Sequence, residues 1–239
     1  MTTAVLLHGA WHGGWCWAAV ASALSRRGCT AVAPDLPAGE ADAGLAAYTT
    51  TALAALAGAG PRDAVGDVVV VGHSLGGLVA PLVAERLLAA GRQVPALVLV
   101  CPLTPQPGVC ARDQARAEPG IYTDAYRAAR LVRHRDGATS MPPDVARELI
   151  YNDAPDEAAA RAAALLRPQH WRMFFEASPL RQWPGAPTRI LAARGDRLLG
   201  RAGMEAAARR LEVEITWLPG GHAPLLTQPE DLARMIVEC

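Results

Sequence analysis

Short apolar runs of strand length alternate along this chain with segments in which apolar residues recur at helical spacing. Such alternation is typical of a parallel sheet whose strands are joined by crossover helices. Six runs are predicted as strands: Thr3 to Leu7, Thr30 to Ala33, Asp67 to Val71, Ala96 to Cys101, Arg189 to Ala193 and Val213 to Leu218. Helical spacing predicts one helix that stops at Gly28 and another that stops at Gly91. We therefore expect an α/β protein with a mainly parallel sheet of about six strands, flanked by helices.

The pattern changes after the fourth predicted strand. From Thr104 to about Ala186 the strand-like runs vanish, and the chain becomes polar and rich in arginine and alanine. Helix-like pieces follow one another there: Tyr122 to Val132, Asp144 to Ile150 and Asp156 to Leu166. We predict a core of residues 1–103 and 187–239, and a helical cap of residues 104–186 inserted after the fourth strand. Ligands of such sheets bind at the carboxyl ends of the strands, so this insertion is predicted to act as a lid.

One pentapeptide, Gly72-His73-Ser74-Leu75-Gly76, lies between a predicted strand and a predicted helix. The pattern Gly-x-Ser-x-Gly in this context is typical of a nucleophile elbow, a sharp turn that exposes a reactive serine. The glycines two positions before and after the serine keep the strand and the helix from colliding. Ser74 is therefore predicted to be a catalytic nucleophile; the alternative is an ordinary glycine-rich turn.

A serine nucleophile requires a base, and the chain order expected in this architecture is serine, then an acid, then histidine. Of six histidines, His222 alone follows the last predicted strand, in a loop with two glycines. Asp196 directly follows the fifth predicted strand, whereas no carboxylate follows the fourth. We predict a triad of Ser74, Asp196 and His222, in which the acid holds the imidazole in the tautomer that accepts the serine proton.

Catalysis by such a triad also requires an oxyanion hole, formed by two backbone N–H groups. Leu75, directly after the nucleophile, is predicted to supply one, and Ala10, in the loop after the first strand, the other. The substrate is predicted to contact four apolar residues: Trp11, Leu103, Trp171 and Phe174. His8 and His12 lie four apart, but a glycine-rich loop gives them no common face and no third ligand motif accompanies them, so we predict no metal site.

Composition narrows the class of protein further. A chain of 239 residues, 51% hydrophobic, can bury one large core. The formal net charge of +0 favours neither a nucleic acid nor an anionic membrane as partner. The N-terminal apolar run is too short for a signal peptide or a membrane span, so we expect a cytoplasmic protein. Five cysteines without a Cys-x-x-Cys pair indicate reduced thiols, not disulfides or a zinc site.

Several of these segments, in this order, cover nearly the whole chain: His8 to Trp17, Pro34 to Pro37, Gly72 to Gly77, Gly195-Asp196 and Gly221-His222. Together they resemble the α/β-hydrolase superfamily, and within it the small serine esterases grouped with plant methyl esterases, salicylate-binding esterases and hydroxynitrile lyases. The resemblance implies the α/β-hydrolase fold and a cofactor-free enzyme with a short cap and a buried, largely apolar pocket. We expect the partner to be a small-molecule ester, and the chain to be a monomer or a homodimer.

The resemblance also separates two reaction classes. The lyases carry a threonine where this chain has Gly9 and a lysine where it has Ala223, and both differences favour ester hydrolysis through an acyl-enzyme. Thioesterases, lactonases and carbon–carbon bond hydrolases use the same catalytic groups and stay open as alternatives. A hydroxynitrile lyase or a ligand-binding receptor without catalytic activity is a further alternative, less favoured because the predicted triad is complete.

Overall fold

A computed structural model describes residues 2–59 and 66–238 of the chain. Its centre is a sheet of six parallel strands in the order β2-β1-β3-β4-β7-β8. The strands are β1 (Thr3–Leu7), β2 (Thr30–Val32), β3 (Val68–His73), β4 (Leu97–Val100), β7 (Thr188–Ala193) and β8 (Ile215–Leu218). All six predicted strands are present, with ends that differ from the prediction by two residues at most. The predicted fold class is confirmed.

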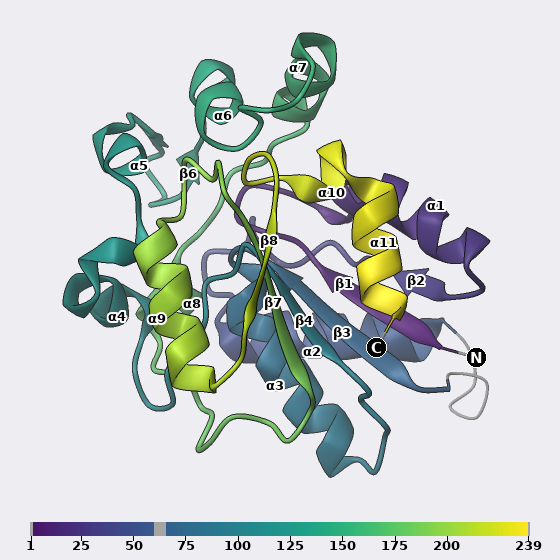
Figure 1. The fold of residues 1–239 in the computed structure, drawn as a ribbon. Coiled ribbons are helices and arrows are strands. Elements are labelled where there is room, and N and C mark those ends of the chain that lie inside the picture. Colours follow the sequence, from purple (N-terminus) through teal and green to yellow (C-terminus); the bar gives the residue numbers. More distant parts are fainter. Residues whose placement is uncertain (1, 60–65, 239) are drawn as a thin grey trace.

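Helices cover both faces of this sheet (Figure 1). Alternate residues of each central strand point into two separate cores, which is why these strands are buried throughout and read as continuous apolar runs. One core holds α1 (Ala18–Arg26) and α11 (Pro229–Val237); the other holds α2 (Leu45–Gly58), α3 (Gly76–Ala89) and α9 (Arg201–Leu211). Among the described residues, no helix has both the length and the apolar character needed to cross a membrane.

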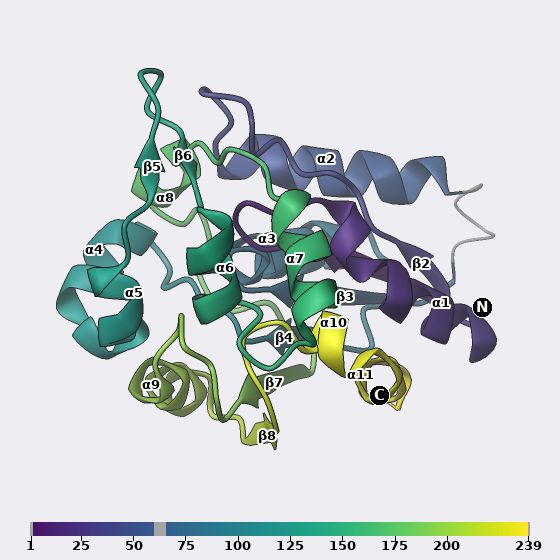
Figure 2. The same cartoon turned by 90° about the horizontal axis from the view of Figure 1, so that it is seen from above.

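The chain between β4 and β7, residues 104–186, is called the cap segment below. Figures 1 and 2 show its helices α5 to α7 above the end of the sheet where the strands finish. Its elements are α4 (Ala111–Ala117), the 3₁₀ helix η2 (Pro119–Ile121), α5 (Asp124–Ala128), β5 (Val132–Arg133), β6 (Thr139–Ser140), α6 (Pro143–Leu149), α7 (Asp156–Ala164) and α8 (Arg172–Phe175). Two of the predicted helical pieces agree with α6 and α7.

The third predicted helical piece, Tyr122 to Val132, is wrong over its second half, and so is the expectation that strands vanish throughout this segment. Helix α5 ends at Ala128, and the next residue has extended backbone. Strand β5 then pairs antiparallel with β6. The turn between them holds Asp136-Gly137, with Gly137 at φ 88°. Asp-Gly is a strong hairpin signal, and it outweighs the helical preference of the preceding residues.

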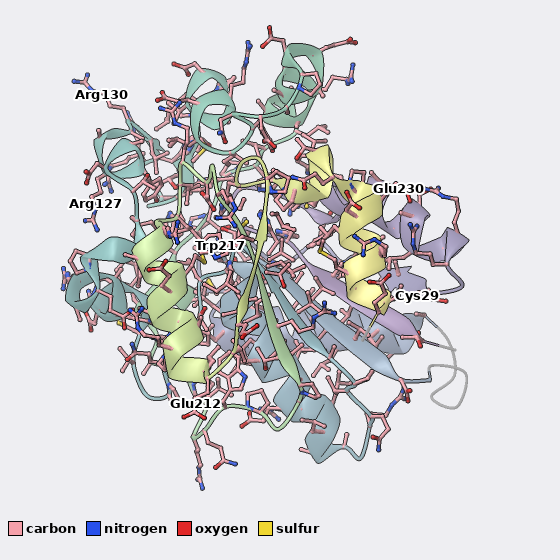
Figure 3. All side chains as sticks on the ribbon, in the orientation of Figure 1. Cys29, Arg127, Arg130, Glu212, Trp217 and Glu230 are labelled. Carbon is pink, nitrogen blue, oxygen red and sulfur yellow. The ribbon has the colours of Figure 1, made fainter. Side chains whose placement is uncertain are left out.

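Figure 3 labels side chains at several places on the surface, among them the edge strand β8 and helix α11. Trp217, labelled there on the edge strand β8, lies beneath the guanidinium groups of Arg194 and Arg201, 5.6 and 5.0 Å from the ring centroid. Charged groups over an edge strand disfavour pairing with another chain. Glu230 of α11 forms ion pairs with Arg26, the last residue of α1, and with Arg27, which follows it. Exposed pairs contribute only about 0–1 kcal/mol, so apolar packing holds these helices together.

The cysteines agree with the prediction of reduced thiols. Four are free and buried: Cys16, Cys29, Cys101 and Cys110. Cys239 lies outside the described residues. The buried thiols are packing residues in the sense expected of small apolar side chains.

Candidate active site

The predicted nucleophile Ser74 lies on the turn between β3 and α3, in the left-handed backbone region at φ 52°. A Cβ at Gly72 would lie 2.6 Å from the carbonyl oxygen of Gly76, and a Cβ at Gly76 would lie 2.4 Å from that of Leu7. Only glycine fits at either position, which is the physical reason for the motif. Leu103 N–H donates to the Ser74 carbonyl at 2.9 Å and ties this turn to the loop after β4.

His222 and Asp196 form a buried pair where the loops after β8 and β7 meet. His222 Nδ1 lies 2.7 Å from Asp196 Oδ2, and the two side chains are 2% and 5% exposed. The other carboxylate oxygen accepts the backbone N–H groups of Leu198 and Leu199, each at 2.8 Å, which fixes its orientation. Because the carboxylate accepts the Nδ1 proton, Nε2 of His222 carries the lone pair that a general base requires.

His73, the neighbour of the predicted nucleophile, supports the loop that carries His222. Its Nε2 donates to the His222 carbonyl at 2.9 Å, and the two rings lie 4.9 Å apart. Burial lowers the pKa of His73 well below its usual value, so the ring is neutral. The Ser74 hydroxyl makes no hydrogen bond among the described residues; such bonds commonly tighten only when substrate is bound.

The two predicted oxyanion-hole donors share an unusual property. Ala10 and Leu75 are both buried, and within the described part of the chain neither backbone N–H has a hydrogen-bond acceptor. Leaving a buried N–H unpaired costs about 1–3 kcal/mol, so such groups are rare outside binding sites. A Cβ at Gly9 would lie 3.0 Å from Ser74 Cβ, so the loop that carries Ala10 packs directly on the predicted nucleophile.

His8 orients the peptide between Gly9 and Ala10. Its Nε2 accepts the backbone N–H of Leu36 at 2.9 Å, so its Nδ1 carries the proton and donates to the Gly9 carbonyl at 2.8 Å. Burial lowers its pKa to about 4, and the ring is neutral at pH 7.

His12 is held in the same tautomer by different partners. Its Nδ1 lies 2.8 Å from the Ala10 carbonyl, which can only accept, so Nδ1 is the donor. The Tyr151 hydroxyl, 2.8 Å from Nε2, must therefore donate to it. Burial lowers the pKa of His12 to about 3. With both nitrogens of each ring engaged, neither His8 nor His12 has a free metal-binding atom.

Among the described residues, one cluster has three side chains of metal-ligating type close together: Cys101, Asp196 and His222, with ligand atoms within 4.8 Å of one another. Burial raises the pKa of the Cys101 thiol well above its usual value, and a neutral thiol is a poor ligand. The other two groups already bind each other. The cluster fits a hydrogen-bonded acid–base pair better than a metal centre.

The residues predicted to contact substrate come together in two places. Trp11 and Trp171 lie edge to face with ring centroids 5.3 Å apart, and Phe174 lies 5.7 Å from Trp171. Both indole N–H groups donate to Thr139 Oγ1, at 3.2 and 2.9 Å. Leu103 lies beside the nucleophile turn through its backbone N–H. That these four residues touch substrate stays a prediction.

Three comparisons with known proteins agree with this fold. A family model described as "Alpha/beta hydrolase family" matches residues 4–235. This chain therefore belongs to the α/β-hydrolase family.

Similar proteins include named esterases and hydrolases. The rice protein "Probable esterase PIR7A" (Oryza sativa subsp. indica) is 32% identical over 178 residues, covering 69% of this chain and 65% of its own length. A pyrethroid hydrolase of Sphingobium wenxiniae is 27% identical over 256 residues, covering 100% of this chain and 87% of its own. The crystal structure of a pyrethroid hydrolase from Sphingobium faniae has a TM-score of 0.81 at 24% identity, covering 99% and 96% of the two chains. This last likeness shows the shared fold.

Proposed function

We propose that this protein is a serine hydrolase that cleaves the carboxylic ester of a small, largely apolar substrate through an acyl-enzyme. One observation carries the proposal: the buried pair of His222 and Asp196, 2.7 Å apart, is bonded through the His222 carbonyl to His73, the neighbour of the left-handed Ser74. Two buried N–H groups, of Ala10 and Leu75, have no acceptor among the described residues. These are the base, the nucleophile and the oxyanion donors that acyl transfer requires. No cofactor enters the proposed reaction.

The proposed reaction has two halves. In the first, His222 Nε2 removes the Ser74 proton while Oγ attacks the ester carbonyl, and the N–H groups of Ala10 and Leu75 bind the developing oxyanion. The imidazolium, stabilised by Asp196, then gives its proton to the departing alcohol. In the second half, His222 deprotonates a water that attacks the acyl-enzyme, and the carboxylic acid leaves with Ser74 restored.

Ester hydrolysis is favoured over cyanohydrin cleavage by the space around the site. The space next to Gly9 is filled by Ser74 and His73, since a Cβ there would lie 3.0 Å from an atom of each. Ala223 is fully buried, and the printed sequence has no lysine to stabilise a departing cyanide. The aromatic cluster of Trp11, Trp171 and Phe174 supports an apolar substrate.

The proposal is tested with purified protein and a panel of p-nitrophenyl esters from short to long acyl chains, together with a thioester and a lactone. We expect the short and medium esters to be hydrolysed fastest. A fluorophosphonate should label Ser74 stoichiometrically, as read by peptide mass spectrometry, and should not label the Ser74→Ala variant. Absence of both hydrolysis and labelling would refute the proposal, and a higher kcat/KM for the thioester or lactone would correct the substrate class.

A further inference from the structure

Three consecutive residues of the cap segment, 151–153, each meet a different loop of the proposed site. The segment begins just after Ile150, the residue that caps α6. Tyr151 forms a buried hydrogen bond with His12. Asn152 forms an exposed hydrogen bond of 3.1 Å with the carbonyl of Gly195. Asp153 packs closely on Gly220, where a Cβ would lie 2.1 Å from a carboxylate oxygen of Asp153.

Of these three contacts, the buried one between Tyr151 and His12 is expected to matter most when it is removed. Asn152 and Asp153 are exposed, so water replaces their partners when they are removed. Tyr151 and His12 are only 2% and 1% exposed. If the Tyr151 hydroxyl is lost, Nε2 of His12 stays buried without a donor, which is the expensive case.

The contacts continue from Tyr151 to the proposed oxyanion donor. Tyr151 donates to His12 Nε2, and His12 Nδ1 donates to the Ala10 carbonyl. On the other side, His8 Nδ1 donates to the Gly9 carbonyl, which belongs to the same amide as the Ala10 N–H. The peptides before and after the Ala10 Cα are thus both held by histidine rings. Because the peptide is trans, the Ala10 N–H, which has no acceptor among the described residues, points opposite to the Gly9 carbonyl.

The loop needs such restraint because its next residue is strained. Trp11 has φ 62°, a conformation that non-glycine residues avoid. Two further residues of the cap segment hold it there: Arg167 N–H donates to the Trp11 carbonyl at 2.7 Å, and Gln169 Oε1 lies 3.4 Å from its N–H. Without these contacts the loop would relax, and the direction of the Ala10 N–H would change with it.

We propose that Tyr151 is a positioning residue for the oxyanion hole, acting through His12. The inference rests on the proposed function, because it assigns Tyr151 a role in placing the Ala10 N–H toward the developing oxyanion. Tyr151 itself touches no reacting atom. Its hydroxyl fixes the tautomer and orientation of His12, which in turn fixes the Ala10 peptide.

The first test is Tyr151→Phe, which removes one oxygen and keeps the ring. We expect kcat for the best ester to fall by about 10- to 100-fold, with KM changed less than about 3-fold, because the contact acts on the transition state. Affinity for a trifluoromethyl ketone, whose adduct carries an oxyanion, should fall in the same proportion. Tyr126→Phe is the matched control: Tyr126 also belongs to the cap segment, but its ring stacks on Tyr122 and it should keep full activity.

The second test asks whether the effect passes through His12. In a His12→Leu background, Tyr151→Phe should change kcat by less than about 2-fold, because the relay is already broken. His12→Asn keeps an amide donor near the Ala10 carbonyl and should retain more activity than His12→Leu of similar size. Circular dichroism melting of each variant shows whether it is folded, and the Asn and Leu pair tests the inference even if Tyr151→Phe does not fold.

The outcomes separate this inference from the proposed function. A wild type that hydrolyses esters and is labelled at Ser74, with Tyr151→Phe equally active, overturns the positioning role and leaves the function standing. Additive effects of Tyr151→Phe and His12→Leu overturn the route through His12. A wild type with neither hydrolysis nor labelling overturns the function, and the inference with it.

Discussion

Three buried histidines, His8 and His12 in the loop after β1 and His73 beside Ser74, make the stability of this protein sensitive to mild acid. Burial lowers the pKa of His8 from 6.5 to about 4 and that of His12 from 6.5 to about 3. An unfolded chain has ordinary imidazoles, which protonate below pH 6.5. Between pH 6.5 and about 4 the unfolded state therefore binds protons that the folded state does not, and stability falls as the pH falls.

The size of the effect follows from the same values. At pH 5 protonation stabilises each unfolded imidazole by about 2 kcal/mol and its folded counterpart by almost nothing. His8 and His12 together therefore lower the free energy of unfolding by about 4 kcal/mol. That is a large part of the 5–15 kcal/mol by which folded domains are usually stable. With a urea m-value of about 2–3 kcal/mol/M, His8 and His12 should lower the unfolding midpoint by about 1 to 2 M between pH 7 and pH 5, and His73 should lower it further.

The assay is urea unfolding followed by circular dichroism at pH 7, 6 and 5. His8→Asn removes one of three buried rings with a lowered pKa, so its midpoint should fall less far than that of the wild type over this range, although the variant starts from a lower stability at pH 7. His134→Asn, in the exposed β5–β6 hairpin, is the matched control and should keep the wild-type pH dependence. A wild-type midpoint that stays constant from pH 7 to pH 5 would refute the conclusion that these rings are neutral in the folded protein.

Three further predictions concern the proposed reaction. Ser74→Ala should lower kcat by about 10⁴-fold or more with an unchanged circular dichroism spectrum; residual activity above a tenth of wild type would exclude Ser74 as nucleophile. Asp196→Asn should lower kcat by about 10²- to 10⁴-fold, because His222 then loses the acceptor that fixes its tautomer; steady-state rates across pH 6 to 9 check this, and an unimpaired variant would place the acid elsewhere. Gly9→Thr should lower esterase activity by about 10²-fold, because its Cβ meets Ser74 Cβ at 3.0 Å, whereas Gly39→Thr, with nothing within 4 Å, should be silent; equal rates for the two variants would contradict the geometry.

The sheet was predictable because its strands leave a local trace. Residues of β1, β3 and β4 are buried on both faces, so each strand is an uninterrupted apolar run. The turn at Ser74 was predictable because its glycine spacing is a recognisable local pattern. The structure shows that Gly72 is required by contacts with the following helix, whereas Gly76 is required by the backbone of Leu7 and His8. The β5–β6 hairpin was missed because two-residue strands are too short to show alternation.

The supporting contacts of the candidate site were not predictable from one sequence. Tyr151 and His12 are 139 positions apart, and nothing near either residue indicates the other. The roles of the histidine rings also depend on partners such as Leu36 N–H, which are set by tertiary structure and not by a motif. Sequence pattern located the groups proposed for the chemistry, whereas most of the groups that orient them, such as Tyr151 and His73, emerged only from the tertiary structure.

The contact of segment 151–153 with three loops has a consequence for the order of events in a catalytic cycle. A movement of α6 large enough to admit substrate would carry Tyr151 away from His12 and Asn152 away from Gly195. Substrate entry and bond cleavage would then be separated in time, because the conformation that admits substrate would lack the Tyr151–His12 contact that cleavage is proposed to need. An open molecule would hold its ester without cleaving it, and each round of hydrolysis would begin with reclosure.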